Sequence, residues 1–152
     1  MQSFEFYTPT KFIMDKDADL LCGREVKRYS DKVLFVHYGD DFTYKSGLYD
    51  RVMGSLREAG LTVFELSGVR PNPEAKLVYK GIEIVRKEGI GCILGAGGGS
   101  VIDTAKAVGI GSKYDGDFWD FYLRKATPQE SLPVGIIMTL PATGSEASNG
   151  SV

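Results

Sequence analysis

The chain has 152 residues, of which 43% are hydrophobic and 25% are charged, a composition typical of one globular domain with its own core. Its formal net charge of −2, with the basic residues scattered, argues against nucleic acid and against a membrane surface as partners. The apolar runs are too short to span a bilayer and the amino terminus lacks a signal-peptide pattern, so we expect a cytoplasmic protein.

The first half of the chain predicts a strand, a helix and a second strand. Residues 33–38 are a short β-branched and aromatic run, typical of a strand that is buried on both faces. In residues 47–60 the apolar side chains recur at i, i+3, i+4 and i+7, so they share one face of a helix. These side chains belong to Tyr49, Val52, Met53 and Leu56. Residues 62–66 predict the second strand.

The next part of the chain repeats this alternation. Asn72 is the expected N-cap of a second helix and Pro73 its first residue. The face of that helix is predicted from Val78, Gly81, Ile82 and Val85. Residues 92–96 predict a third strand, and Ser100 is expected to open a third helix. Ser100 and Asp103 have the spacing of a capping box, which would define where that helix begins.

The last part adds a short aromatic helix, expected within residues 117–123, and a fourth strand at residues 133–139. Strands that alternate with helices indicate βαβ units and a parallel sheet with helices on its faces. We therefore predict a doubly wound, Rossmann-like α/β fold in one domain, residues 1–152. Ligands bind such sheets at the carboxyl ends of the strands, and every unusual loop of this sequence follows a predicted strand.

The run GAGGGS, residues 95–100, is a candidate phosphate site between the third strand and the third helix. Glycines allow a pyrophosphate to approach the backbone, and the N–H groups of a first helical turn favour an anion. The alternative is a tight strand-to-helix turn that serves packing alone. An ATP-type loop is disfavoured because no lysine follows the glycines at the position that the G-x-x-x-x-G-K-[ST] motif requires. The standard dinucleotide fingerprint also fails, because the next strand ends at Met138 and Thr139 without an acid.

An acid pair, Asp40 and Asp41, instead follows the first predicted strand. A carboxylate at this position could accept hydrogen bonds from both ribose hydroxyls of adenosine and would repel a 2′-phosphate. The alternative is two solvated aspartates in a turn. The residues by themselves leave both interpretations open.

The sequence gives little support for a metal site or for a hydrolase triad. The single histidine, His37, lies inside the first predicted strand and is expected to be a core residue. Cys22 and Cys92 lie too far apart for paired metal ligands, and Cys92 is expected to be buried as a small apolar residue. The sequence lacks G-x-S-x-G, so we predict no serine hydrolase triad.

Four segments in order resemble the iron-containing (group III) alcohol dehydrogenases, in particular their butanol dehydrogenase-like branch: YGDDFTYKSGLYDRV, GVRPNP, GAGGGSVIDTAKAV and IIMTLPATGSEAS. The resemblance covers residues 30–150, whereas the amino-terminal KFIMDKDADLLCG fits only loosely. It implies the NAD(P)-binding domain of a metal-dependent alcohol dehydrogenase or aldehyde reductase, with hydride transfer between nicotinamide and an alcohol or aldehyde. It also suggests a homodimer formed through the amino-terminal region.

The resemblance also implies which residues contact the cofactor. Gly97, Gly98, Gly99 and Ser100 would hold the pyrophosphate, with Asp103 supporting the start of the helix. Asn72 would lie by the adenosine half, and Thr139, Leu140 and Thr143 would line the cofactor toward the nicotinamide. Many aldehyde-reducing relatives have YGGGS after the first strand, where small residues and a serine accept the 2′-phosphate of NADP, whereas this sequence has Tyr38-Gly39-Asp40-Asp41-Phe42. This departure favours NAD over NADP, with Asp40 as the carboxylate that binds ribose.

Family members also have a helical second domain, in which an aspartate and three histidines bind iron or zinc. That domain is absent from this sequence, so we expect neither catalytic residues nor metal ligands in it, and a chain that is catalytically incomplete, either a shortened form or a natural fragment. Two alternative functions remain open: a non-catalytic nucleotide-binding module and a phosphate-binding α/β domain.

Overall fold

One sheet is made of four parallel strands: β1 (Lys32–His37), β2 (Thr62–Ser67), β3 (Cys92–Gly97) and β4 (Val134–Met138). The computed structural model describes residues 9–142 and 144–151, so the predicted site residue Thr143 lies outside the described residues. The strand order is β2-β1-β3-β4. The chain runs outward from β1 to β2 and, in the other direction, from β3 to β4, which places the topological switch point between β1 and β3.

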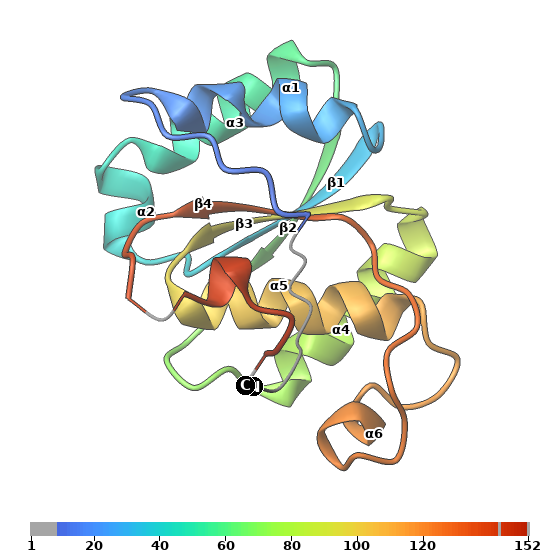
Figure 1. Ribbon diagram of the computed structural model, residues 1–152. Helices are drawn as coiled ribbons and strands as arrows, with labels where there is room; N and C mark the ends of the chain where they lie inside the picture. The colour runs from blue at the N-terminus through green and yellow to red at the C-terminus, as the bar shows by residue number, and fades with distance from the viewer. Residues whose placement is uncertain (1–8, 143, 152) are drawn as a thin grey trace, which may run out of the picture.

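Helices cover both faces of the sheet: α1 (Cys22–Lys27) and α3 (Leu48–Glu58) lie on one face, α4 (Ala75–Glu88) and α5 (Gly99–Ser112) on the other (Figure 1). Successive residues of a strand point to opposite faces. In β1, Phe35 therefore packs with the residues of α1 and α3, while Leu34 packs with those of α4 and α5. Both side chains are fully buried. The predicted doubly wound α/β fold is confirmed.

The apolar faces predicted for the first two helices are also confirmed. In α3, Val52, Met53 and Leu56 are buried, and α4 buries its four predicted positions. The predicted start of α4 is wrong, because the N-cap is Glu74 rather than Asn72. Asn72 instead adopts a left-handed backbone, with φ of 59°, in the turn before Pro73. Asparagine tolerates this conformation, and the residue before a proline is disfavoured in the helical region, so the chain turns here before the helix begins.

The capping box predicted for α5 is wrong as well. The helix begins at Gly99, one residue earlier than expected, and its N-cap is Gly98, which has no side chain to accept a hydrogen bond. Asp103 does not cap the helix; its carboxylate accepts the hydroxyl of Ser145 over 2.9 Å. The start of α5 is therefore supported by backbone geometry alone. Asp103 instead contacts Ser145, a residue that is distant in the sequence.

Several short elements have no counterpart in the sequence prediction: η1 (Ala18–Leu21), α2 (Asp41–Lys45) and η2 (Ser145–Ala147), in addition to α1. The aromatic helix expected within residues 117–123 is present as α6 (Trp119–Tyr122), and Phe118 anchors it in the core with 2% of its surface exposed. Within the part of the chain that the structure describes, no helix is long and apolar enough to cross a bilayer.

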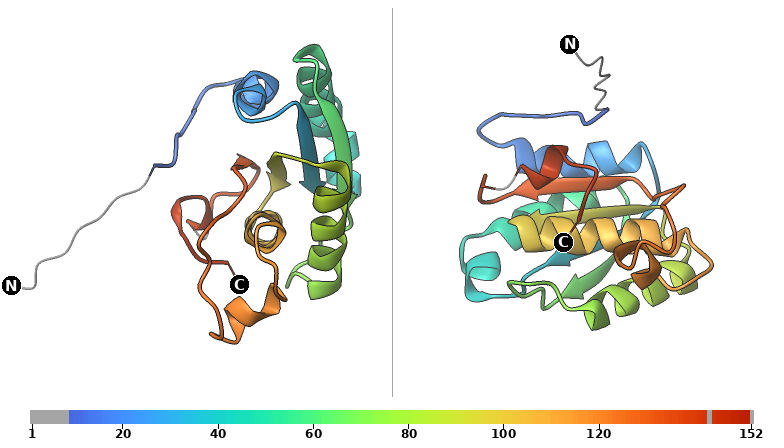
Figure 2. Two further views of the ribbon diagram at one scale, coloured as in Figure 1. Left: turned by 90° about the vertical axis from the view of Figure 1, so that its right-hand side faces the viewer. Right: turned by 60° about the horizontal axis from the view of Figure 1, so that its bottom comes forward.

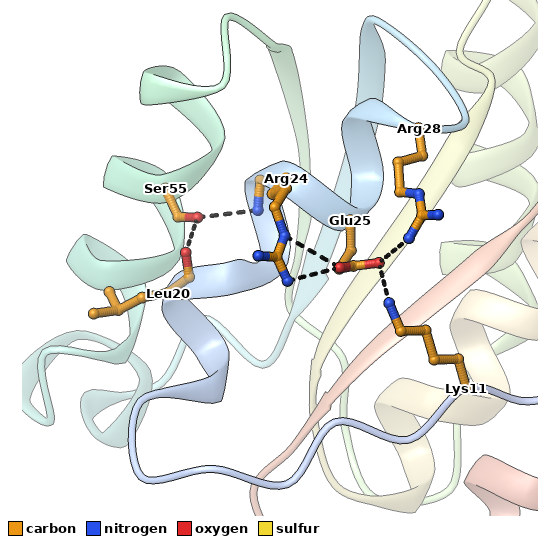
Figure 3. A network of polar contacts seen from close by, with 7 residues as sticks. Lys11, Leu20, Arg24, Glu25, Arg28 and Ser55 are labelled. Atoms are coloured by element: carbon orange, nitrogen blue, oxygen red, sulfur yellow. Dashed lines mark hydrogen bonds and ion pairs between the residues drawn. The ribbon is translucent and has the colours of Figure 1, made fainter.

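The helix α1 is held against α3 through Ser55 (Figure 3). The hydroxyl of Ser55 accepts the N–H of Gly23 over 3.0 Å and donates to the carbonyl of Leu20 over 2.6 Å. A Cβ at Gly23 would lie 2.0 Å from the Ser55 carbonyl oxygen, so this approach requires glycine. The carboxylate of Glu25 in α1 forms ion pairs with three side chains: Lys11, Arg24 and Arg28.

Candidate functional site

Three strand ends meet at the switch point of the sheet. Tyr38 directly follows β1, Gly98 follows β3 and Leu140 comes shortly after β4. A Cβ built on Gly98 would lie 3.2 Å from the Tyr38 hydroxyl and 4.0 Å from the Cβ of Leu140. The N–H of Thr139 donates to the carbonyl of Gly97 over 3.1 Å. The loops after β1, β3 and β4 therefore surround the glycine turn, where a doubly wound sheet binds its ligands.

Packing within the protein already requires glycine at position 97. Gly97 is buried, and a Cβ there would lie 2.5 Å from a methyl carbon of Val101 and 2.9 Å from the ring of Tyr38. The tight-turn interpretation thus explains this glycine without a ligand. Gly97 shapes the predicted phosphate site, while the groups that could bind an anion come after it.

The backbone N–H groups of Gly99 and Ser100 are the best candidates for anion binding. They open α5, a helix of 14 residues, and both residues are partly exposed. The N–H groups of a first helical turn have no acceptor within the helix, and the helix dipole adds positive potential there. The next N–H, that of Val101, bonds to the carbonyl of Gly98, and the N–H of Gly98 itself donates to the Tyr38 hydroxyl over 3.3 Å.

Asp40 is the N-cap of α2. Its Oδ1 accepts the N–H of Thr43 over 2.9 Å and the hydroxyl of Thr43 over 2.7 Å. These hydrogen bonds hold the pKa of the Asp40 carboxyl below its ordinary value, so the group is charged at neutral pH. A carboxylate offers about four lone-pair sites, and both bonds use Oδ1. The fold thus orients Asp40, and its Oδ2 takes part in neither of these two hydrogen bonds.

The two acids of the pair differ in their surroundings. Asp41 forms an exposed ion pair with Lys45, one turn later in α2, over 2.6 Å. The pairing of β1 with β3 aligns His37 with Ala96, so Asp40 and Gly99 each come three residues after an aligned position. The structure therefore places Asp40 and the start of α5 after neighbouring strands.

Asn72 lies in the loop after β2, at the far side of the switch point, and is exposed. Beside this loop is a hollow lined by residues 68–70, by the start of α4 and by Thr104 of α5. Lys76 and Lys80 give the hollow a basic wall. Asn72 is not part of its lining, although other residues of the segment GVRPNP are; Lys76, Lys80 and Thr104 were not among the predicted site residues.

Lys106 of α5 was also not among the predicted site residues. Its ammonium donates to three backbone carbonyls of the segment after β4, those of Ser145, Ser148 and Gly150. Asp103, one turn earlier in α5, accepts the Ser145 hydroxyl. In Figure 2 this segment, drawn in red, runs beside α5. A lysine three residues after an aspartate on one helix face was the available signal.

The family model described as "Iron-containing alcohol dehydrogenase" matches residues 9–152. The chain belongs to the iron-containing alcohol dehydrogenase family. Within this family it is 47% identical over 152 residues to the "Probable NADH-dependent butanol dehydrogenase 1" of Bacillus subtilis (strain 168). It is 30% identical over 155 residues to the "NADPH-dependent aldehyde reductase YqhD" of Escherichia coli (strain K12). The alignments cover 100% of this chain and 39% of each relative.

Solved structures of the iron-containing alcohol dehydrogenases agree with the fold. The crystal structure of an NADH-dependent butanol dehydrogenase A from Thermotoga maritima superimposes with a TM-score of 0.90 at 40% identity. The match covers 95% of this chain and 36% of that protein. The chain therefore spans well under half the length of the relatives that it matches, and the resemblance predicted from the four sequence segments is confirmed.

His37 is a core residue of this alcohol dehydrogenase family domain, as predicted. Its side chain is fully buried against the rings of Phe35 and Tyr49, with centroids 4.8 and 5.7 Å away. Burial lowers the pKa of His37, although the carboxylate of Glu65, 3.5 Å from Nε2, opposes the shift. Cys92 is buried too, and burial raises the pKa of its thiol to about 11. Among residues 9–142 and 144–151, no three His, Cys, Asp or Glu side chains are grouped to hold a metal ion.

Proposed function

We propose that the chain, residues 1–152, is the dinucleotide-binding domain of a metal-dependent alcohol dehydrogenase or aldehyde reductase. The observation that carries this proposal is the partly exposed first turn of α5 at the switch point, next to the strand end that bears the charged Asp40. In the whole enzyme, a nicotinamide cofactor would exchange a hydride with the carbon of an alcohol or aldehyde.

The proposed contacts follow the strand ends. The N–H groups of Gly99 and Ser100 bind the pyrophosphate, while Gly97 and Gly98 shape the turn that presents them. Asp40 accepts the ribose hydroxyls, and Asn72 borders the adenosine half. Thr139, Leu140 and Thr143 line the path toward the nicotinamide. Asp103 supports this site indirectly, through its hydrogen bond with Ser145.

We propose NAD rather than NADP as the cofactor. A carboxylate that is charged at neutral pH attracts hydroxyl donors and repels a phosphate dianion at the 2′ position. The relative at 47% identity is named an NADH-dependent enzyme, whereas the relative named as NADPH-dependent is 30% identical. Both observations support the same preference.

We assign activation of the alcohol or aldehyde to a further domain of the whole enzyme. A divalent metal there, iron or zinc, would polarise the oxygen of the alcohol or aldehyde as a Lewis acid. The residues described for this chain take no part in that step. We further propose that the whole enzyme is a cytoplasmic homodimer and that it binds neither nucleic acid nor membranes.

Calorimetric titration of the 152-residue chain with NADH, NADPH, ADP-ribose and inorganic phosphate tests this assignment. We expect NADH and ADP-ribose to bind, NADPH to bind more weakly, and phosphate to compete with ADP-ribose only at much higher concentration. A dissociation constant for NADPH below that for NADH would contradict the role of Asp40.

The same titration separates the alternative functions. Phosphate binding that is as tight as ADP-ribose binding would indicate a simple anion site on α5. Tight binding of ADP or ATP, titrated as two further ligands, together with failure of NADH to bind, would indicate a nucleotide-binding module of another kind.

A further inference from the structure

We propose that Lys106 and Asp103 are positioning residues, which clamp the segment after β4 onto α5 and thereby hold the nicotinamide end of the cofactor site in place. The proposal rests on the proposed dinucleotide function. It goes further by assigning a task to two residues that make no contact with the proposed pyrophosphate groups.

The contacts of Lys106 match its chemistry. An ammonium group has three N–H donors, and the structure offers it three backbone carbonyls, two of them at 2.8 Å. The third carbonyl belongs to Ser145, whose hydroxyl also lies 3.3 Å from Nζ. The group is partly buried, which lowers its pKa, but the charges of Asp103 and Glu146 oppose that shift. One side chain thus gathers carbonyls spread over residues 145–150.

Asp103 completes the clamp from the same helix face. Its Oδ1 accepts the hydroxyl of Ser145 over 2.9 Å, and Ser145 is buried with 9% of its surface exposed. Ser145 is therefore held twice, through its hydroxyl by Asp103 and through its carbonyl by Lys106. Burial of a serine beside an aspartate and a lysine costs free energy unless these hydrogen bonds are made.

The clamp fixes one end of the loop that carries Leu140. The other end is fixed by the bond from the Thr139 N–H to the Gly97 carbonyl, over 3.1 Å. Gly97 is the last residue of β3, and the clamp lies on α5 directly after it. Both anchors thus belong to the β3–α5 unit that forms the glycine turn. The position of Leu140 relative to the proposed pyrophosphate site therefore depends on the clamp.

The variant Lys106→Met tests this proposal in the 152-residue chain, because it keeps a long apolar stem but leaves the three carbonyls without their donor. We expect amide hydrogen exchange in residues 144–151 to accelerate at least about tenfold, since tenfold corresponds to the loss of one hydrogen bond and the variant loses three. Exchange within α5 should stay as in the unmodified chain. Lys106→Arg, which retains donors, should restore most of the protection.

Cofactor affinity provides the second measurement. NADH carries the nicotinamide and ADP-ribose lacks it, so Lys106→Met should raise the dissociation constant of NADH about five- to tenfold and change that of ADP-ribose less than twofold. The matched control is Lys113→Met, at the C-cap of the same helix, where the side chain is exposed and we expect neither readout to change.

The outcomes are distinguishable. Unchanged exchange in residues 144–151 of Lys106→Met would overturn the clamp, and equal losses for NADH and ADP-ribose would overturn its link to the nicotinamide end. Failure of the unmodified chain to bind either ligand would overturn the proposed function, while the exchange data would still decide the clamp. If Lys106→Met does not fold, Ser145→Ala removes the hydroxyl contacts with Asp103 and Lys106 but keeps the carbonyl contacts of Lys106, and it should give a smaller change in the same direction.

Discussion

The hydroxyl of Tyr38 accepts the N–H of Gly98 over 3.3 Å, so the residue after β1 is tied to the glycine turn after β3. The ring of the same tyrosine occupies the space in which a side chain at Gly97 would lie. The glycines of this turn therefore serve two purposes, since they admit Tyr38 from inside the protein and leave the backbone of Gly99 and Ser100 accessible from outside.

Tyr38→Phe isolates the hydrogen bond from the ring packing. The phenylalanine keeps the contact with Gly97 but leaves the N–H of Gly98 without the hydroxyl acceptor. We expect the free energy of unfolding to fall by about 1 kcal/mol, measured by urea denaturation. Tyr29→Phe, at a side chain with 64% of its surface exposed, is the control and should have no effect. An equal loss in both variants would show that the bond to Gly98 contributes nothing.

Gly97→Ala tests the packing at the turn. A Cβ would lie 2.5 Å from a methyl carbon of Val101, so we expect a loss of about 1–3 kcal/mol in the free energy of unfolding. Gly54→Ala is the matched control within α3, where the new Cβ would have no atom within 4 Å apart from its chain neighbours and the adjacent backbone of its own helix. There alanine should stabilise the chain by up to about 1 kcal/mol through helix propensity. Destabilisation of both variants to the same extent would contradict the packing argument.

The strands and long helices could be predicted because their periodicity reports burial directly. The apolar positions of α3 and α4 face the core as expected, and α5 follows the third strand. The short helix α2 was missed because five residues carry almost no periodic signal. Its best signal is Asp40 with Thr43, a capping pair, whereas the acids were considered as a ribose ligand or as solvated turn residues.

The errors in the site arise where one residue type serves two uses. Asn72 is favoured both as an N-cap and in a left-handed turn, and only the tertiary structure selects the second. Asp103 has capping-box spacing, but its partner is Ser145, which lies 42 residues later. Lys106 contacts backbone carbonyls 39 to 44 residues later, and the spacing of Asp103 and Lys106 within α5 does not identify these partners. Long-range polar contacts of this kind require the fold to be known.

The substitution Asp40→Ser tests cofactor preference without removal of the cap of α2. Serine can still accept the N–H of Thr43, so the helix should persist, while the negative charge is lost. We expect the ratio of NADPH to NADH affinity to rise on the order of tenfold, because repulsion of the 2′-phosphate disappears. Asp41→Ser is the matched control, since that carboxylate is paired with Lys45, and it should leave the ratio unchanged. A similar change in both variants would show that net charge, rather than Asp40, sets the preference.

The single histidine of the chain makes the stability depend on pH in a predictable direction. Burial lowers the pKa of His37 in the folded state below its ordinary value of 6.5, so as the pH falls below 6.5 the unfolded chain takes up a proton that the folded chain resists. Stability should therefore decrease on acidification through this range, with a slope from this group of at most about 1.4 kcal/mol per pH unit. Urea denaturation at pH 7.5, 6.5 and 5.5 measures it, and in His37→Phe this part of the slope should vanish. Because the carboxylate of Glu65 lies 3.5 Å from Nε2 and favours the protonated form, Glu65→Gln should steepen the slope of the unmodified chain. A slope that stays the same in His37→Phe would assign the pH dependence to other groups.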